Sequence, residues 1–273
     1  MNLEADDQSP DDEMPEGSSD ALADRISDRL TGGEETAEAV GTEGDAIEIL
    51  EEEKVKDEIE IQVDLLQDPD WVVRREAAVT LGEMADERCV EPLAKALRDG
   101  DWQVREAAVD ALANVGSPAV ETLIRMLRVW EVRRAAIQAL GKIKDERVLD
   151  PLVAQLRIDE FREDATTALT EVGRPAVSRL LAALKDKDEY VRKQAVIVLG
   201  RIKDPEAIDA LIALLQDGDW YIRLTAAAAL EAIHDERGRE AIKPLMKDPD
   251  LVVRMRVERI LAAWKRKKEE VSA

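Results

Sequence analysis

Residues 102–115, WQVREAAVDALANV, carry the pattern that decides the fold, and similar stretches recur at 71–84, WVVRREAAVTLGEM, and at 220–233, WYIRLTAAAALEAI. Each stretch has an Arg at its fourth position. Apolar residues stand one position before that Arg and three, seven and ten positions after it. These offsets fall on one stripe of an α-helix. The pattern therefore predicts an amphipathic helix that packs its apolar stripe against other elements.

The same helix recurs seven times along the chain, with an Arg column spaced by 31, 28, 29, 30, 31 and 31 residues. The Arg column consists of Arg74, Arg105, Arg133, Arg162, Arg192, Arg223 and Arg254. Seven residues after each of them stands a Leu, and three residues after them stands Ala in six repeats and Val257 in the last. Self-similarity at a fixed period of this length indicates a repeat architecture. The small Ala column predicts a place where two helix backbones approach closely.

A second apolar segment precedes each of these helices, for example 90–97 and 207–215. Pro92, Pro151 and Pro244 suit the first turn of a helix, where a missing N–H costs nothing. Gly116 and Gly173, each followed closely by Pro, indicate the end of one helix and the beginning of the next. The unit is thus helix A, a turn and helix B, and units that cannot bury their apolar faces alone must stack. The fold class expected is all-α: a right-handed α-solenoid of about seven hairpins, at approximately 46–86, 87–116, 117–145, 146–173, 174–204, 205–236 and 237–268.

The acidic charge of the chain is concentrated at its N-terminus. The formal net charge is −22, and residues 1–58 hold 21 acidic and 4 basic side chains, so that residues 59–273 are nearly balanced. Segments this polar cannot offset their ordering entropy. We therefore expect a disordered acidic tail over 1–44, with Asp45 capping the first helix of a 45–273 repeat domain. Leu22, Ile26 and Leu30 form a short apolar stripe, read either as a transient helix or as a docking segment.

Composition excludes several classes of function. Cys89 is the only Cys and His234 the only His, which argues against disulfide frameworks and Cys- or His-based metal sites. A pI near 4.6 argues against nucleic-acid binding, and no apolar run is long enough to span a bilayer. We expect a cytoplasmic protein that binds neither nucleic acid nor membrane and holds no cofactor. We read Cys89 as a packed thiol, and nothing around His234 indicates catalysis.

The blocks Trp71-Val72-Val73-Arg74, Leu81-Gly82, Asp86-Glu87-Arg88 and Val90-Glu91-Pro92-Leu93 resemble HEAT-like repeats of the phycobilin-lyase (PBS lyase) type. The resemblance covers about residues 46–273. It implies a HEAT-like solenoid whose helix B row lines the concave side, and HEAT-like folds in general imply protein binding. The family includes chromophore-lyase subunits, di-iron hydroxylases and scaffold proteins. The hydroxylases bind iron through repeated His-Glu pairs, which this sequence lacks.

Asp stands four residues before the Arg in five repeats and predicts a structural ladder with the Arg column. An Asp there caps helix B and can pair with the Arg one turn later. By the resemblance, such side chains form ladders between neighbouring units. These capping residues are Asp70, Asp101, Asp188, Asp219 and Asp250. In repeats 3 and 4 the turn is shortened and Val129 and Ile158 replace the Asp, which indicates either neutral drift or a local change of superhelix curvature.

The aromatic residues are few and collect at the start of helix B. Position −3 from the Arg holds Trp71, Trp102, Trp130 and Trp220, and position −2 holds Tyr190 and Tyr221. Trp and Tyr dominate interface hot spots, and exposed Trp is costly unless a partner covers it. We predict a partner-binding row here. The alternative is that these rings lie over the neighbouring turn as the edge of the core.

Charged residues on the variable positions of helix B complete the predicted partner-binding set. Arg134 lies in repeat 3, and repeat 4 contributes Asp159, Glu160, Glu163 and Asp164. The C-terminal end is basic, with Arg256, Arg259 and 265–268. One interpretation is a solvated surface. The other is a groove with an acidic centre and basic ends that would orient a charged partner and could attract the acidic tail in an intramolecular contact.

Three functional hypotheses follow from these patterns. The first is a non-catalytic scaffold that binds a protein partner of unknown identity. The second is an accessory or lyase-type subunit that handles a cofactor or chromophore in a Trp-lined groove. The third is a metal-dependent protein-modifying enzyme of the kind found among the hydroxylases that the fold resembles. No nucleophile, phosphate loop or Ser/His/Asp set supports an enzyme, so we favour the scaffold.

Overall fold

The computed structural model describes residues 57–272, with side chains described as far as Trp264. The chain divides into two units, 1–61 and 62–273. The predictions for the acidic tail, the Leu22 to Leu30 stripe and the Asp45 cap fall on residues outside the described part, as do those for the side chains of 265–268. The account below concerns the second unit and the helix with which it begins.

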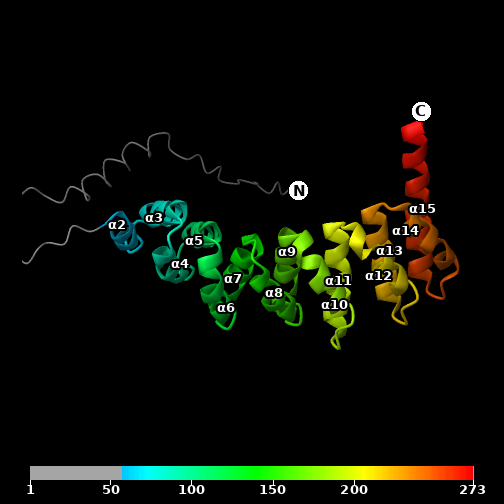
Figure 1. Cartoon of the computed structure of the whole chain (residues 1–273), viewed down its shortest axis with the longest axis horizontal. Coiled ribbons are helices and arrows are strands. Elements are labelled where there is room, and N and C mark those ends of the chain that lie inside the picture. The colour runs from blue at the N-terminus through cyan, green and yellow to red at the C-terminus, as the bar shows by residue number, and fades with distance from the viewer. Residues whose placement is uncertain (1–56, 273) are drawn as a thin grey trace, which may run out of the picture. The chain divides into compact units, whose positions relative to one another are not determined.

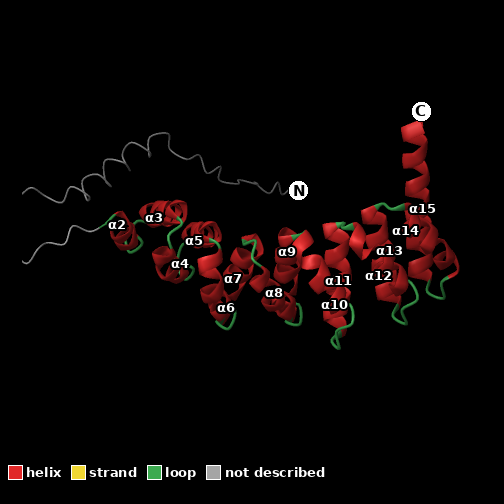
Figure 2. Ribbon diagram, in the orientation of Figure 1, coloured by secondary structure: helices red, strands yellow, loops and turns green. Residues whose placement is uncertain are grey.

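Between residues 57 and 272 the chain forms fourteen α-helices and no strand, in seven hairpins (Figures 1 and 2). We number the hairpins as repeats 1 to 7. The helices A are α2 (Glu58–Leu65), α4 (Val90–Ala96), α6 (Val120–Met126), α8 (Leu149–Gln155), α10 (Val177–Ala183), α12 (Ile208–Leu214) and α14 (Glu236–Ile242). The helices B are α3 (Trp71–Met84), α5 (Trp102–Val115), α7 (Trp130–Lys142), α9 (Arg162–Val172), α11 (Glu189–Ile202), α13 (Trp220–Ile233) and α15 (Leu251–Ser272).

The hairpins stack in chain order into two rows. Each helix B contacts the helix B before and after it, from α3 through α15. Among the helices A, α4 contacts α6, α8 contacts α10 and α12 contacts α14. Figure 1 shows α4, α6, α8, α10 and α12 on one side of the stack, opposite the helices B. This arrangement confirms the predicted all-α solenoid. None of the described helices is both long enough and apolar enough to cross a membrane.

The core lies between the two rows and is built from the predicted columns. The Leu seven residues after the Arg is completely buried in repeats 1 to 6, as at Leu81, Leu140 and Leu230. The Ala column three residues after the Arg is at most 1 % exposed from Ala77 to Ala226. Because an isolated hairpin would expose these stripes to water, burial against the neighbouring repeats supplies the hydrophobic stabilisation.

Each helix A from repeat 2 to repeat 6 is preceded by a short 3-10 turn, which begins in one of two ways. After repeats 1, 3 and 5 an Asp side chain accepts a hydrogen bond from the amide two residues later, as at Asp86, Asp145 and Asp204. After repeats 2 and 4 the turn begins at Gly116 or Gly173, whose φ values of 76° and 72° favour glycine. The two kinds of turn alternate along the chain.

A period of two repeats also appears in the packing of helices B. A Cβ placed on Gly82, Gly141 or Gly200 would lie 2.5–2.9 Å from the Cα of an Ala in the next helix B. The Ala residues contacted are Ala111, Ala168 and Ala229. These glycines stand eight residues after the Arg in repeats 1, 3 and 5 only. Helices B therefore meet at backbone distance in the pairs α3/α5, α7/α9 and α11/α13, at a column different from the predicted Ala column.

The shortened turns of repeats 3 and 4 change how helix B begins. Val129 precedes α7 without a side-chain cap, and in repeat 4 a 3-10 turn over Asp159–Phe161 replaces the first helical turn, so that α9 begins at Arg162. The missing Asp explains the absent side-chain cap in both repeats, because the aliphatic side chains of Val129 and Ile158 have no oxygen that could accept from the first amides of the helix. An altered superhelix curvature at these repeats stays a prediction.

Candidate partner-binding face

The aromatic residues of the helix B row lie at the N-terminal ends of the helices, and most of them are exposed. The exposed fraction is 60 % for Trp102, 54 % for Trp130, 50 % for Tyr190 and 43 % for Trp220. Trp71 and Tyr221 are half-buried, and the Tyr221 ring meets that of Trp220 edge to face, with a centroid separation of 5.7 Å. The row therefore consists of four open rings and two half-buried ones.

The five Asp residues at position −4 cap helix B. In each case a carboxylate oxygen accepts a hydrogen bond from the backbone N–H two residues later, at 2.8–3.0 Å. The donors are the amides of Val72, Gln103, Tyr190, Tyr221 and Val252. The cap fixes the first turn of helix B and thereby the direction in which the aromatic side chain next to it points.

Among the ion pairs of the described residues, none joins an Arg of the column to the capping Asp of its own repeat, so the expected pairing one turn apart is replaced by other contacts. A helical side chain leans toward the N-terminus of its helix, so the long Arg reaches past the cap into the turn between helices A and B. Arg74 Nη1 donates to the carbonyl oxygens of Asp68 and Pro69, at 2.8 and 3.1 Å. The equivalent carbonyls accept from Arg105, Arg192, Arg223 and Arg254.

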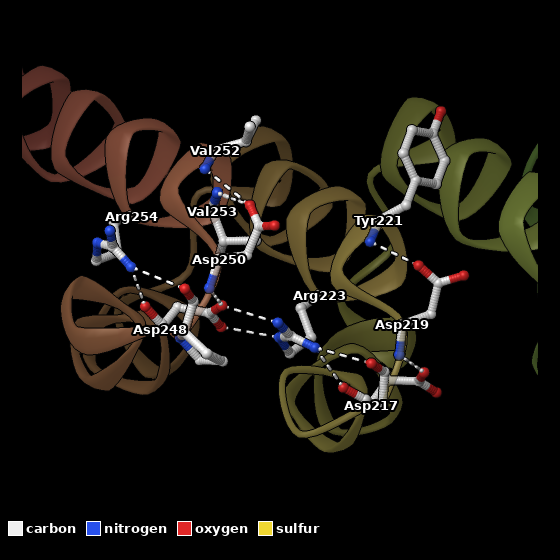
Figure 3. Close-up of polar contacts among 11 residues, drawn as sticks. Asp217, Asp219, Tyr221, Arg223, Asp248, Asp250, Val252, Val253 and Arg254 are labelled. Carbon is white, nitrogen blue, oxygen red and sulfur yellow. Dashed lines mark hydrogen bonds and ion pairs between the residues drawn. The ribbon is translucent and has the colours of Figure 1, made fainter.

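Two of these Arg residues also bind an Asp of the next repeat, six residues before the next Arg. Arg74 binds Asp99 through Nε and Nη2, at 2.7 and 2.8 Å. Arg223 binds Asp248 in the same bidentate way, at 2.8 Å for both bonds (Figure 3). The hydrogen bond from Arg223 lowers the pKa of Asp248 from its usual value, and Asp248 raises the pKa of Arg223. The inter-repeat ladder is thus built from an Asp that the sequence analysis did not single out.

In the middle of the stack the Arg column meets aromatic rings instead. Arg133 lies over the rings of Trp130 and Phe161, with its guanidinium carbon 5.8 and 5.1 Å from the ring centroids. Trp130 and Phe161 themselves meet edge to face at 5.0 Å. The Nε of Arg133 is buried and has no hydrogen-bond partner among the described residues. The shortened turn of repeat 4 offers no Asp here, so the cation is held by ring faces, which attract it through the ring quadrupole.

The alternation of cations and rings continues into repeats 5 and 6. Arg162 lies 4.5 Å from the Tyr190 ring centroid, and Lys193 lies between the rings of Tyr190 and Tyr221 at 6.0 and 5.7 Å. Lys193 Nζ also pairs with Asp219 at 2.9 Å. These groups, with Gln194 and Trp220, line a pocket of about 420 Å³. The pocket presents apolar ring surface beside two cations, each of which also pairs with a carboxylate, Arg162 with Asp159 and Lys193 with Asp219.

The charged residues predicted for partner binding lie next to this row, and several pair between repeats. Arg134 binds Asp164 at 3.0 Å, and Glu163 accepts from Arg201 at 3.0 Å. Asp159 pairs with Arg162, and Glu160 is exposed. Glu163 and Asp164 line a second pocket together with Glu106, Glu171 and Lys142. The acidic centre is therefore partly neutralised by its own neighbours.

His234 and Cys89 both have structural surroundings. His234 follows α13 with a left-handed φ of 63°, and its Nδ1 accepts a hydrogen bond from the indole N–H of Trp264. Cys89 is completely buried at the start of α4. Among the described residues, no group of three or more His, Cys, Asp or Glu side chains could hold a metal ion.

Two members of the site were missed by reasoning from the sequence. Lys193 occupies a variable position, and only its place between two Tyr-bearing turns distinguishes it. Phe161 stands in the apolar column one position before the Arg and is 3 % exposed, and the Phe in a column otherwise made of Val and Ile was the available signal. An aromatic residue in an otherwise aliphatic column indicated a ring that a neighbouring Arg could contact through its cation.

Comparison with known proteins agrees with the repeat pattern. A profile described as HEAT repeats matches at residues 59–129, 90–170, 158–231 and 177–262, which together extend over more than half of the chain. The chain belongs to the HEAT repeat family. Its comparison with curated proteins gives no match.

Several solved structures are similar to the HEAT repeats of this chain. The complex of CpcE and CpcF of phycocyanin lyase from Nostoc sp. PCC7120 is 22% identical, with 85% of this chain and 99% of that chain covered and a TM-score of 0.36. Human deoxyhypusine hydroxylase in complex with glycerol is 22% identical over 76% and 84%, with a TM-score of 0.38. The archaeal HEAT-like repeats protein from Thermococcus onnurineus NA1 is 13% identical over 75% and 95%, with a TM-score of 0.39.

Proposed function

We propose that this HEAT repeat protein is a non-catalytic scaffold that binds a protein partner through the N-terminal ends of its helices B. The single observation that carries the proposal is the alignment of Trp102, Trp130, Tyr190 and Trp220, each at least 43 % exposed, in a described region that is otherwise poor in aromatic residues. Burying a large ring against a partner releases water from a wide apolar area at the cost of few rotors.

The setting of the rings supports binding rather than packing. Trp130 is held at its edge by Phe161 and below by Arg133, so its orientation is fixed while about half of its surface stays open. A ring that is ordered before binding loses little conformational freedom when the partner arrives. The paired charges nearby, such as Arg134 with Asp164, would serve as the polar rim.

The test is affinity capture followed by quantitative binding with two matched triple variants. The first, Trp102→Ala/Trp130→Ala/Trp220→Ala, removes three open rings. The second, Arg125→Ala/Arg179→Ala/Arg237→Ala, removes three exposed cations of the helix A row, each of which pairs with the preceding helix A. A partner bound by wild type should bind the Trp variant at least tenfold more weakly and the helix A variant unchanged.

Equal binding of the partner by wild type and by the Trp variant would refute the assignment of this face. Circular dichroism melts of all three proteins control for unfolding. Since the Arg variant removes only exposed ion pairs, worth about 0–1 kcal/mol each, its melting should differ little from that of wild type.

A further inference from the structure

The Arg column ends at Arg254, in the last repeat, where no further repeat follows among the described residues. Arg254 Nη1 donates to the carbonyl oxygens of Asp248 and Pro249, just as Arg223 Nη1 donates to those of Asp217 and Gly218. In Figure 3 the guanidinium of Arg223 also reaches the carboxylate of Asp248, whereas that of Arg254 has dashed lines to its own turn alone. The Nε and Nη2 edge of Arg254 has no hydrogen bond to any part of the chain that the structure describes.

This edge is prepared for a carboxylate. At Arg74 and Arg223 the same Nη1 contacts hold the guanidinium in place, and the remaining Nε and Nη2 atoms bind an Asp of the next repeat at 2.7–2.8 Å. Planar bidentate binding of this kind is specific for carboxylates and close analogues. The Arg223–Asp248 pair between repeats 6 and 7 therefore shows how Arg254 would bind a carboxylate.

An apolar patch lies beside Arg254 on the first turns of α15. We call Leu251, Val252 and Met255 the end patch, and they are 58 %, 50 % and 47 % exposed. They are neighbours on one side of the helix, at spacings of three and four residues. Farther along α15, Glu258 replaces the buried Ala, Val, Ile or Thr that earlier repeats place four residues after the Arg. The end patch is thus an apolar surface on the first turns of α15, bounded farther along the helix by the exposed, charged Glu258.

We propose that Arg254 and the end patch form a binding site for a partner segment that presents an Asp or Glu beside an aliphatic or aromatic side chain. The carboxylate would accept from Nε and Nη2 of Arg254, and the apolar side chain would cover Leu251 and Met255. The template for the carboxylate contact is Asp248, which binds Arg223 from the turn 245–252. Leu251 in the same turn is 58 % exposed and serves as the apolar side chain of the probe. This site uses none of the rings of the aromatic row, although Leu251 and Val252 stand at the positions of helix B that Trp220 and Tyr221 hold in repeat 6. It extends the face of the proposed function by one repeat, and it does not depend on whether the rings bind a partner.

The test is an NMR titration of the full chain, observed at the methyl group of Met255 and at the Nε–H of Arg254. The probe is a synthetic peptide with the sequence of residues 245–252, and its control is the same peptide carrying Asp248→Asn. We expect saturable shifts at both resonances with the first peptide and at least tenfold weaker binding of the second. Arg254→Lys, which keeps the charge but loses the bidentate edge, should also weaken binding at least tenfold.

Arg192→Gln is the matched control variant. Arg192 likewise bonds only to its own turn carbonyls in the described chain, but it lies inside the stack, away from the end patch. Its substitution should leave peptide binding within twofold of wild type. The proposal is overturned if the Met255 resonance does not shift, if the Asn peptide binds as well as the Asp peptide, or if Arg192→Gln weakens binding as much as Arg254→Lys. The triple Trp variant should still bind the peptide, whether or not the proposed function holds.

Discussion

The outer repeats and the middle repeats use the same Arg column in different ways. Between repeats 1 and 2 and between repeats 6 and 7, the Arg binds an Asp of the next turn at 2.7–2.8 Å. In repeats 3 and 4, Arg133 and Arg162 lie against the rings of Trp130, Phe161 and Tyr190. For Arg133 the difference follows from the shortened turn of repeat 4, which lacks the Asp. The Asp that the next repeat offers to Arg162, Asp186, binds Arg157 instead. These repeats show how an Arg without an Asp partner can contact an aromatic ring instead.

Loss of the outer ion pair should have the largest effect. Arg223→Ala leaves the carboxylate of Asp248, a residue only 4 % exposed, without its ionic partner. Removing one member of a buried pair typically costs about 3–5 kcal/mol of unfolding free energy. Urea unfolding measures this loss. The control is Arg237→Ala, which removes a member of an exposed ion pair and should lower the unfolding free energy by about 0–1 kcal/mol. Equal costs for the two variants would show that the buried ladder does not stabilise the outer repeats.

The hydrophobic core, by contrast, should not distinguish the middle from the outer repeats. Leu140 in repeat 3 and Leu230 in repeat 6 are both completely buried. Substitution of either by Ala leaves a cavity and should lower the unfolding free energy by about 2–5 kcal/mol. Thermal and urea unfolding of the two variants should give similar losses. If Leu140→Ala left the unfolding free energy nearly unchanged, the core of the middle repeats would be loosely packed. The middle and outer repeats would then differ in their cores as well as in their polar contacts.

Substitutions at the contacts between helices B should lower stability mainly in every second interface, those of α3/α5, α7/α9 and α11/α13. Gly141→Val places a side chain where a Cβ alone would lie 2.7 Å from the Cα of Ala168, and overpacking of this kind costs about 1–3 kcal/mol. Ala113→Val, at the same column of repeat 2, should cost about 0.5 kcal/mol or less, mainly through the lower helix propensity of Val. Calorimetry of both variants tests the two-repeat period, which equal losses would contradict.

The cation held by the rings should contribute least to stability. Arg133→Ala removes contacts with Trp130 and Phe161 but leaves no carboxylate buried, so we expect a loss of about 0.5–2 kcal/mol, the range of cation–π contacts. The same variant should increase the mobility of the Trp130 indole, measured by fluorescence anisotropy decay. An unchanged anisotropy decay would mean that Arg133 does not hold the ring in place.

Much of the fold could be predicted because the repeat displays its core directly. The Leu and Ala columns recur at helical spacing, and each is buried as a helix packed on two neighbours requires. The ladder was harder to predict. The backward lean of the Arg side chain carries it past the Asp at −4 to the carbonyls of its own turn, and its ionic partner lies on the next repeat, as Asp99 does for Arg74. The Gly82, Gly141 and Gly200 column was readable as a signal of close approach, but it becomes visible only when alternate repeats are compared.

The candidate face was predictable in its residues but not in its contacts. The row of Trp and Tyr follows from the positions alone, whereas the exposed fraction of each ring depends on what the neighbouring repeat places beside it. Trp102 is open and Trp71 is half-buried, although both occupy position −3 after a capping Asp. The sequence pattern cannot separate the two, because their positions relative to the Arg and to the capping Asp are the same.

The most direct test of the account is hydrogen–deuterium exchange of the full chain with and without a partner captured through wild type. We predict that the partner protects the amides in the first turns of α5, α7, α11 and α13, next to Trp102, Trp130, Tyr190 and Trp220, and leaves the helix A row unchanged. Protection confined to α4, α6, α8, α10 and α12 would contradict the assignment of the binding face to helix B.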